Sequence, residues 1–195
     1  MTTGEVTTVT SPRRIADFTL DDWERLEPVE GYRVELVDGL YRVNAAPVPW
    51  HQKVADRLGR MLAPIVEPLG WDVLSAIGVR IRPGLGYIPD LVICERVPRG
   101  AKSVTAATIV LAVEVVSPSS RKIDRHEKPI AYAKAGIPAY WRAEIVKDHL
   151  TSVHCYRLED NGHYVEHTVV EPGKPQTISL PIDAEITLDV DTLDR

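Results

Sequence analysis

The chain combines a length of 195 residues with the composition of an ordinary globular protein, since 44% of its residues are apolar and 26% are charged. This balance excludes a disordered polymer, and no segment approaches the ~20 apolar residues of a transmembrane helix. Residues 1–15 predict a flexible arm without the apolar run of a signal peptide, and residues 16–195 predict one cytoplasmic domain.

The net charge of -5 gives no general electrostatic footprint for nucleic acid. Basic residues are nevertheless concentrated in one segment, which contains Arg121, Lys122, Arg125 and Lys128. Such a cluster is either a solvated face or a cradle for phosphates.

Two cysteines, Cys94 and Cys155, each fall inside a predicted strand. Neither belongs to a Cys-X-X-Cys pair, so the sequence predicts neither a disulfide framework nor a zinc site. We expect two buried, reduced thiols.

The first elements are a short helix and a hairpin. Thr19 and Asp22 have the spacing of a capping box, and the apolar residues that follow share one helical face. Asp38-Gly39 separates apolar runs over 33–36 and 40–43, which predicts two strands joined by a tight turn.

A longer helix is predicted over residues 51–69, where apolar residues recur at helical spacing. Gly70 suits the position after its last turn. Pro64 should kink this helix or end it early.

Strands dominate the middle of the chain. Residues 71–81 predict one strand, 83–86 a turn, and 91–94 a strand opened by Pro89. Residues 109–116 form an almost unbroken β-branched run, which is typical of a central strand covered on both faces.

The last third predicts a helix over 130–135 that ends at Gly136, then a strand over 139–145. Residues 152–158 and 164–170 predict a hairpin that extends the sheet, and the tail from Thr177 is loosely strand-like. Tyr132, Tyr140 and Trp141 have the spacing of core residues.

Glu114 is conspicuous because it interrupts the run over 109–116, and a buried carboxylate is costly unless it is paired or binds a metal. Asp90 precedes a neighbouring predicted strand and could present its carboxylate at the same sheet edge. Two such carboxylates form the hard-oxygen site that Mg²⁺ prefers. Alternatively, Pro89-Asp90 is only a turn, and Glu114 faces water on an edge strand.

Five blocks of sequence resemble the Uma-two family of restriction-endonuclease-like nucleases, in the PD-(D/E)XK superfamily. The blocks are VELVDG at 34–39, PVPWH at 47–51, PDLV at 89–92, EVVSPSS at 114–120 followed by Lys128, and AGIPAYW at 135–141. Their order and spacing agree over residues 18–170.

The resemblance implies an α/β (α+β) restriction-endonuclease-like core, a mixed β-sheet flanked by helices, to which the predicted C-terminal hairpin is an addition. It also implies phosphodiester hydrolysis in DNA with Mg²⁺ or Mn²⁺, and a homodimer. Asp90 and Glu114 would be the metal ligands, Glu35 a third acidic group on the first helix or strand, and His51 a conformational or phosphate contact. Arg121, Lys122 and Arg125 would contact the substrate.

The family's usual catalytic lysine sits two residues after the glutamate, where this chain has Val116. Lys128 resembles a relocated lysine, and Lys122 is the nearer competitor in sequence. Pro129 should disfavour a helical backbone at Lys128.

For Glu35 and His51, a purely structural role is the alternative. Glu35 could simply pair with Arg33 or Arg42 across the hairpin, and His51 could cap its helix or be solvated.

Three functions are compatible with the sequence. A nuclease is favoured by Asp90 and Glu114, whereas the absent lysine and the acidic pI favour a degenerate fold that binds nucleic acid or protein. A hydrolase of small phosphate esters would use the same metal site, although the basic cluster speaks for a polymer.

Overall fold

The computed structural model describes residues 17–117 and 120–195. The predicted arm over 1–15 and the central Pro-Ser of the EVVSPSS block lie outside the described residues. Within them, the chain forms two large sheets and a small one, together with helices. The strands are β1 (Tyr32–Val37), β2 (Leu40–Ala45), β3 (Trp71–Ser75), β4 (Gly78–Arg82), β5 (Leu85–Tyr87), β6 (Leu91–Glu95), β7 (Ser103–Thr105), β8 (Ile109–Val116), β9 (Ala139–Val146), β10 (His149–Leu158), β11 (Tyr164–Val170), β12 (Gln176–Ser179) and β13 (Glu185–Leu188). The helical elements are α1 (Leu20–Glu24), α2 (Pro49–Val66), η1 (Glu67–Leu69), η2 (Ala106–Thr108), the π-helical turn η3 (Ile123–Glu127), α3 (Lys128–Lys134) and α4 (Val190–Leu193).

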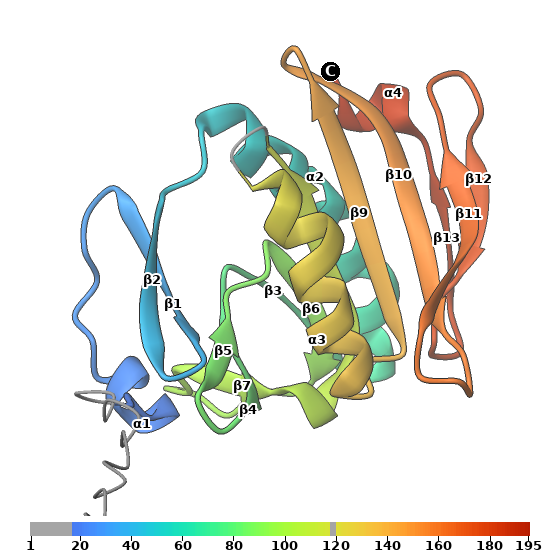
Figure 1. Ribbon diagram of the computed structural model, residues 1–195. Helices are drawn as coiled ribbons and strands as arrows, with labels where there is room; N and C mark the ends of the chain where they lie inside the picture. The colour runs from blue at the N-terminus through green and yellow to red at the C-terminus, as the bar shows by residue number, and fades with distance from the viewer. Residues whose placement is uncertain (1–16, 118–119) are drawn as a thin grey trace, which may run out of the picture.

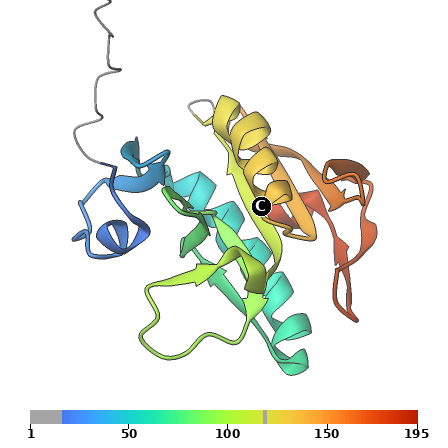
Figure 2. The same ribbon diagram turned by 60° about the horizontal axis from the view of Figure 1, so that its bottom comes forward.

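The six-stranded sheet is the centre of the fold, with strand order β11-β10-β9-β8-β6-β3. It is mixed, because β8 and β9 run parallel while the other neighbours are antiparallel. Figure 1 shows α3 in front of this sheet and α2 behind it, and the turned view in Figure 2 shows the sheet between the two helices. The predicted mixed sheet flanked by helices is confirmed.

Strand β8 is covered on both faces, and its pleat sorts its side chains between two cores. Leu111, Val113 and Val115 join the core that includes Leu58 of α2, whereas Ala112 joins the core that includes Tyr132 of α3. Because successive side chains of a strand point to opposite faces, Glu114 lies on the α3 face. The burial expected of this strand is confirmed.

The five-stranded sheet has the order β2-β1-β5-β4-β7. Its β1–β2 hairpin turns at Asp38 and Gly39, whose φ values are 50° and 77°, as the Asp-Gly signal predicted. The single strand predicted over 71–81 is wrong: Ala76 adopts a φ of 52°, and the chain leaves β3 in one sheet to begin β4 in the other. The turn predicted over 83–86 is shorter, since β5 already begins at Leu85.

Helix α2 runs to Val66 and ends through η1 at Gly70, whose φ is 91°. The expected early end at Pro64 is wrong. Pro64 lies in the last turn at an exposed position, so the missing N–H costs little where the helix is about to become a 3₁₀ turn.

The C-terminal third adds to the sheet and then folds back. Strands β10 and β11 form the predicted hairpin beside β9. The tail forms β12, β13 and α4, whose buried residues Ile178, Leu188 and Leu193 join the core on the α2 side. Cys94 and Cys155 are free and buried, as expected.

None of the described helices is both long enough and apolar enough to cross a bilayer.

Gly86 permits the close approach of α1 to the five-stranded sheet. It pairs with Leu36 across β1 and β5, and a Cβ atom at position 86 would overlap the indole of Trp23. We expect Gly86→Ala to lower the free energy of unfolding by about 1 to 3 kcal/mol, as overpacking of a core does. Urea unfolding measures this, and the loss should shrink when Trp23→Ala is introduced as well. An unchanged urea midpoint for Gly86→Ala would contradict this packing.

Candidate active site

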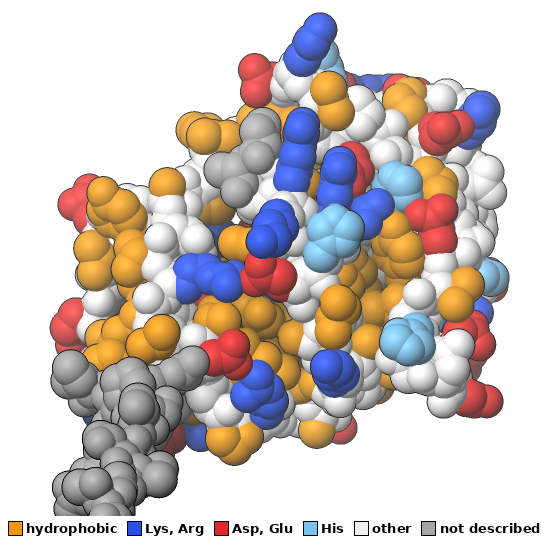
Figure 3. All heavy atoms as spheres, viewed as in Figure 1, with side chains coloured by type: hydrophobic (Ala, Val, Ile, Leu, Met, Phe, Trp, Pro, Cys, Tyr) orange, Lys and Arg blue, Asp and Glu red, His pale blue; other side chains and the backbone are white. Residues whose placement is uncertain are grey.

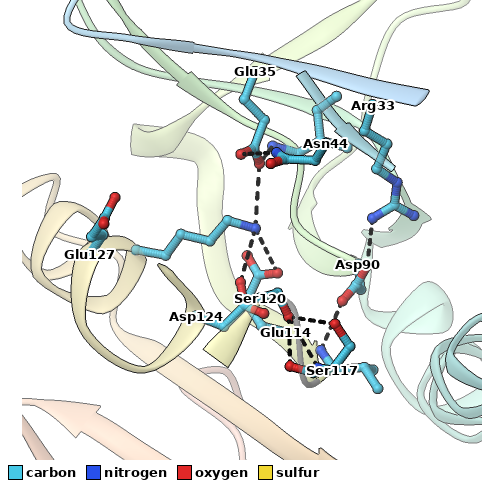
Figure 4. A network of polar contacts seen from close by, with 12 residues as sticks. Arg33, Glu35, Asn44, Asp90, Glu114, Ser117, Ser120, Asp124 and Glu127 are labelled. Atoms are coloured by element: carbon cyan, nitrogen blue, oxygen red, sulfur yellow. Dashed lines mark hydrogen bonds and ion pairs between the residues drawn. The ribbon is translucent and has the colours of Figure 1, made fainter. Parts of the chain in front are cut away.

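A cleft of about 630 Å³ lies between the β1–β2 hairpin and the end of strand β8. Its lining includes Asp90, Glu114, Lys128, Glu35 and His51, five residues that the sequence singled out. Figure 4 shows polar contacts around Glu35, Asp90 and Glu114 in this cleft. The side chains are almost inaccessible to solvent: 4% of Asp90, 1% of Glu114 and 6% of Lys128 are exposed.

Asp90 is placed by the pairing of β6 with β8. Leu91 pairs with Val113, so the next position along this antiparallel register sets Asp90 opposite Glu114. The backbone N–H of Asp90 donates to the Val113 carbonyl at 3.1 Å, and its Oδ2 accepts from the Val115 N–H at 2.8 Å. Asp90 is therefore fixed to the strand that carries Glu114.

Two basic side chains also contact the Asp90 carboxylate. Arg33 Nη1 lies 2.6 Å from Oδ1, and His51 Nε2 lies 3.1 Å from Oδ2. Burial alone would raise the pKa of Asp90, but the hydrogen bond from His51 and the positive charges nearby lower this pKa to about 2. Asp90 is thus an anion at neutral pH.

Glu114 is held from the α3 side. Lys128 Nζ lies 2.9 Å from Oε2, and the Tyr132 hydroxyl donates to Oε1 at 2.6 Å. Burial raises the pKa of Glu114 well above its usual range. The positive charge of Lys128 lowers this pKa, whereas the negative charges of Asp124 and Asp90 raise it further.

Lys128 opens helix α3, and its backbone is helical with φ −62° and ψ −49°. Pro129 was expected to disfavour a helical backbone at Lys128, and the backbone there is helical nonetheless. Pro129 occupies the first turn of α3, where its missing N–H is no loss, and η3 already supplies a helical turn before it.

The Lys128 ammonium is surrounded by acids. Besides Glu114, it lies 3.4 Å from Glu35 Oε1 and 3.4 Å from Asp124 Oδ1. Burial alone would lower the pKa of Lys128, but the carboxylates hold it well above its usual range. Lys122, its competitor in sequence, is exposed and is not among the residues that line the cleft.

Glu35 lies on strand β1, and the alternative pairing with Arg33 or Arg42 is wrong. Its carboxylate accepts from Asn44 Nδ2 at 3.2 Å and from the backbone N–H of Ile88 at 3.1 Å. Arg33 binds Asp90, and Arg42 binds Glu127 at 2.9 Å. The hairpin therefore sends Glu35 inwards, toward Lys128.

His51 lies in the first turn of α2 and is buried, not solvated. Its Nε2 contacts Asp90, while its Nδ1 has no hydrogen-bond partner among the described residues. This nitrogen is a buried, unsatisfied polar atom in the cleft lining.

Of the basic cluster, Lys128 lines the cleft, whereas Arg121, Lys122 and Arg125 do not. Figure 3 shows Lys and Arg side chains gathered on the face above η3 and α3. Arg121 and Lys122 are exposed, whereas the guanidinium of Arg125 donates to both oxygens of Glu144, at 3.0 and 2.7 Å. Arg125 is thus already paired.

The structure adds three residues that the sequence did not single out for this site: Arg33, Asp124 and Tyr132. Tyr132 is a core residue, as predicted, but its hydroxyl also belongs to the site. Asp124 precedes Lys128 by four residues, the spacing of neighbours on a helix, which was the available signal. No sequence signal indicated Arg33, because its partner Asp90 lies 57 residues away in the chain.

The donor set suits a hard cation. The carboxylates of Asp90, Glu114, Glu35 and Asp124 outnumber the two fixed cations Arg33 and Lys128, so a divalent ion would relieve their repulsion. The described residues contain no group of three or more His, Cys, Asp or Glu that could hold a metal. Mg²⁺ needs only one or two carboxylates when waters and substrate phosphates complete its shell, and Asp90 and Glu114 fit that pattern.

The fold and this acidic cleft define a restriction-endonuclease-like protein. A family described as "Uma2: Putative restriction endonuclease" matches residues 20–191, so the chain belongs to the Uma2 family. No curated protein matches the chain.

A solved structure shares the fold. It is titled as a putative nuclease belonging to DUF820 from Anabaena variabilis ATCC 29413, and it matches with a TM-score of 0.68 at 16% sequence identity. The match covers 90% of this chain and 97% of that one. At this identity the likeness shows the fold alone.

The lowered pKa of Asp90 predicts a specific loss of stability in acid. Its anionic form stabilises the folded state above the ordinary value of 3.8, and this contribution is lost as the pH falls through about 2. We expect the free energy of unfolding of Asp90→Asn to fall less steeply than that of the wild type between these values. Denaturant unfolding at stepped pH measures this. The exposed Asp56→Asn should follow the wild type, and parallel curves for all three proteins would contradict the assignment.

Removal of Lys128 should expose the cost of burying Glu114. Because burial raises the pKa of Glu114, its contribution to stability is lost as the pH rises above the ordinary value of 4.5. We expect Lys128→Met to lower the free energy of unfolding by about 3 to 5 kcal/mol at pH 8 and by less at pH 5.

Glu114→Gln added to Lys128→Met should restore part of that loss, since the buried charge of Glu114 is then removed while those of Glu35 and Asp124 remain. Lys134→Met, on the exposed side of the same helix, is the control. Equal losses for Lys128→Met at both pH values would show that the Glu114 charge is not responsible.

Proposed function

We propose that this chain is a Mg²⁺- or Mn²⁺-dependent endonuclease that hydrolyses phosphodiester bonds of DNA in the cleft between β1 and β8. The observation that carries the proposal is the 2.9 Å contact between Lys128 and Glu114, in a cleft that Asp90 also lines. A lysine beside two acids is the set of groups that metal-assisted phosphodiester hydrolysis uses. Membership of the Uma2 family supports the same class of reaction.

Each residue has a separate role in this proposal. Asp90 and Glu114 would hold the cation, which when bound polarises the scissile phosphate and lowers the pKa of a bound water. Lys128 would give up some of its contacts with the surrounding carboxylates. Its ammonium would then donate to the attacking water and offset charge on the phosphate. Glu35 would keep the Lys128 ammonium at the cleft.

The surroundings suit a polymer substrate. Arg121 and Lys122 are exposed, and their neighbours in the chain, Ser120 and Ile123, line the cleft, so the two basic side chains would contact phosphates that flank the cut. His51 would use its unpartnered Nδ1 for a phosphate or a bridging water. A homodimer would supply two such sites, one for each strand of a duplex.

One observation favours a binding module as the second candidate. The oxygens of Asp90 and Glu114 that would hold a cation already have protein partners. A protein that kept these pairs permanently would bind nucleic acid without cutting it.

Cleavage of supercoiled plasmid DNA with Mg²⁺ or Mn²⁺ separates the candidates. We expect the wild type to nick and linearise the plasmid, and Asp90→Asn, Glu114→Gln and Lys128→Met to lower the rate by about 100-fold or more. EDTA should abolish cleavage by the wild type.

Asp56→Asn and Lys134→Met are the matched controls, because each changes the same kind of side chain at an exposed position. Equal rates for the wild type and the three cleft variants would overturn the proposal. A wild type that retards the plasmid in a gel but leaves it uncut would favour the binding module.

A further inference from the structure

Three carboxylates from three separate elements surround the ammonium of Lys128. Glu114 on β8 lies 2.9 Å from Nζ, while Glu35 on β1 and Asp124 on η3 each lie 3.4 Å away. An ammonium has three N–H donors, so this shell can satisfy it fully. The side chain of lysine is long and flexible, and its position in the cleft depends on these partners.

Hydrogen bonds of its own backbone hold Asp124 in place beside Lys128. Its N–H donates to the Ser120 carbonyl at 2.9 Å, and its carbonyl accepts from the Tyr140 hydroxyl at 2.5 Å. Tyr140 belongs to the central strand β9, so the π-helical turn is tied to the sheet at Asp124. Only 3% of Asp124 is exposed, and its side chain lies beside Glu114 in Figure 4.

The irregular turn gives Asp124 its position. A π-helical turn places one extra residue in the helical path, and such turns occur often at functional sites. Here the turn directly precedes Lys128, and Asp124 is its i−4 neighbour. The burial of an acid on this turn is costly unless the acid pairs with a cation, and Asp124 contacts the cation Lys128.

Glu127 provides an internal comparison. It lies on the same turn but pairs with Arg42 at 2.9 Å, and about a third of its side chain is exposed. The two acids of one turn thus face different surroundings, one the cleft and the other the surface.

We propose that Asp124 is a positioning residue that holds the Lys128 ammonium against Glu114 for the cleavage reaction. The expected effect of Asp124 on the cleavage rate rests on the proposed function. The expected effect on the position of Lys128 does not, because this position can be measured in a protein with no activity.

The kinetic test is a double-mutant cycle on DNA cleavage with Mg²⁺. We expect Asp124→Asn, which keeps the shape of the side chain, to lower kcat by about 10- to 100-fold with little change in KM, as a misplaced catalytic group does. Glu127→Gln should match the wild type. In the Lys128→Met background, Asp124→Asn should have no further effect, because residues that act as a unit are not additive.

The structural test measures acetylation of each lysine by mass spectrometry. Nζ of Lys128 is buried in the wild type, so it should react slowly. We expect Asp124→Asn to raise the labelling rate of Lys128 roughly tenfold while leaving Lys134 on the same helix unchanged. Glu127→Gln should leave both rates unchanged, and circular dichroism should report the same helix content in all three proteins.

These outcomes separate the two proposals. An inactive wild type whose Lys128 becomes reactive in Asp124→Asn would remove the nuclease and keep the positioning role. An active wild type with additive losses in the cycle, or with Lys128 labelling that Asp124→Asn does not change, would overturn the positioning role and keep the nuclease.

Discussion

The buried ion pair between Lys128 and Glu114 is the constraint around which this protein is arranged. It joins the first residue of α3 to a residue near the end of strand β8, with almost no access to solvent. A charge in that position is tolerated only with a partner and further hydrogen bonds. Tyr132, Glu35 and Asp124 supply them, so elements far apart in the chain must converge on one point.

The two faces of the central sheet therefore differ in how they are packed. The α2 face is an apolar core, to which the C-terminal strands and α4 add. The α3 face begins as an apolar core around Tyr132 and Tyr140 and becomes polar where β8 ends at the cleft. The buried charges of the cleft thus lie on the α3 side of the sheet, beyond its apolar core.

The charged side chains of the site are buried and in contact with one another. The protein is acidic overall, and the cleft is acidic as well, with carboxylates in excess of its fixed cations. Lys and Arg side chains that could contact a polyanion are gathered on the face shown in Figure 3. A fold supports many functions, so the case for a nuclease rests on these residues together with the Uma2 family, and not on the shape of the sheet.

The sequence by itself determined much of the local structure and the two central acids. Asp38-Gly39 fixed a hairpin because its backbone tolerates positive φ, and the β-branched run of β8 required burial, which made Glu114 conspicuous. Only the tertiary structure decided which groups meet those acids. Arg33 reaches Asp90 across 57 positions of the chain, and Asp124 and Tyr132 meet Glu114 and Lys128 because α3 packs on one face of the sheet. The break at Ala76 and the helical backbone at Lys128 were likewise set by packing, which overrides the local preferences of the residues involved.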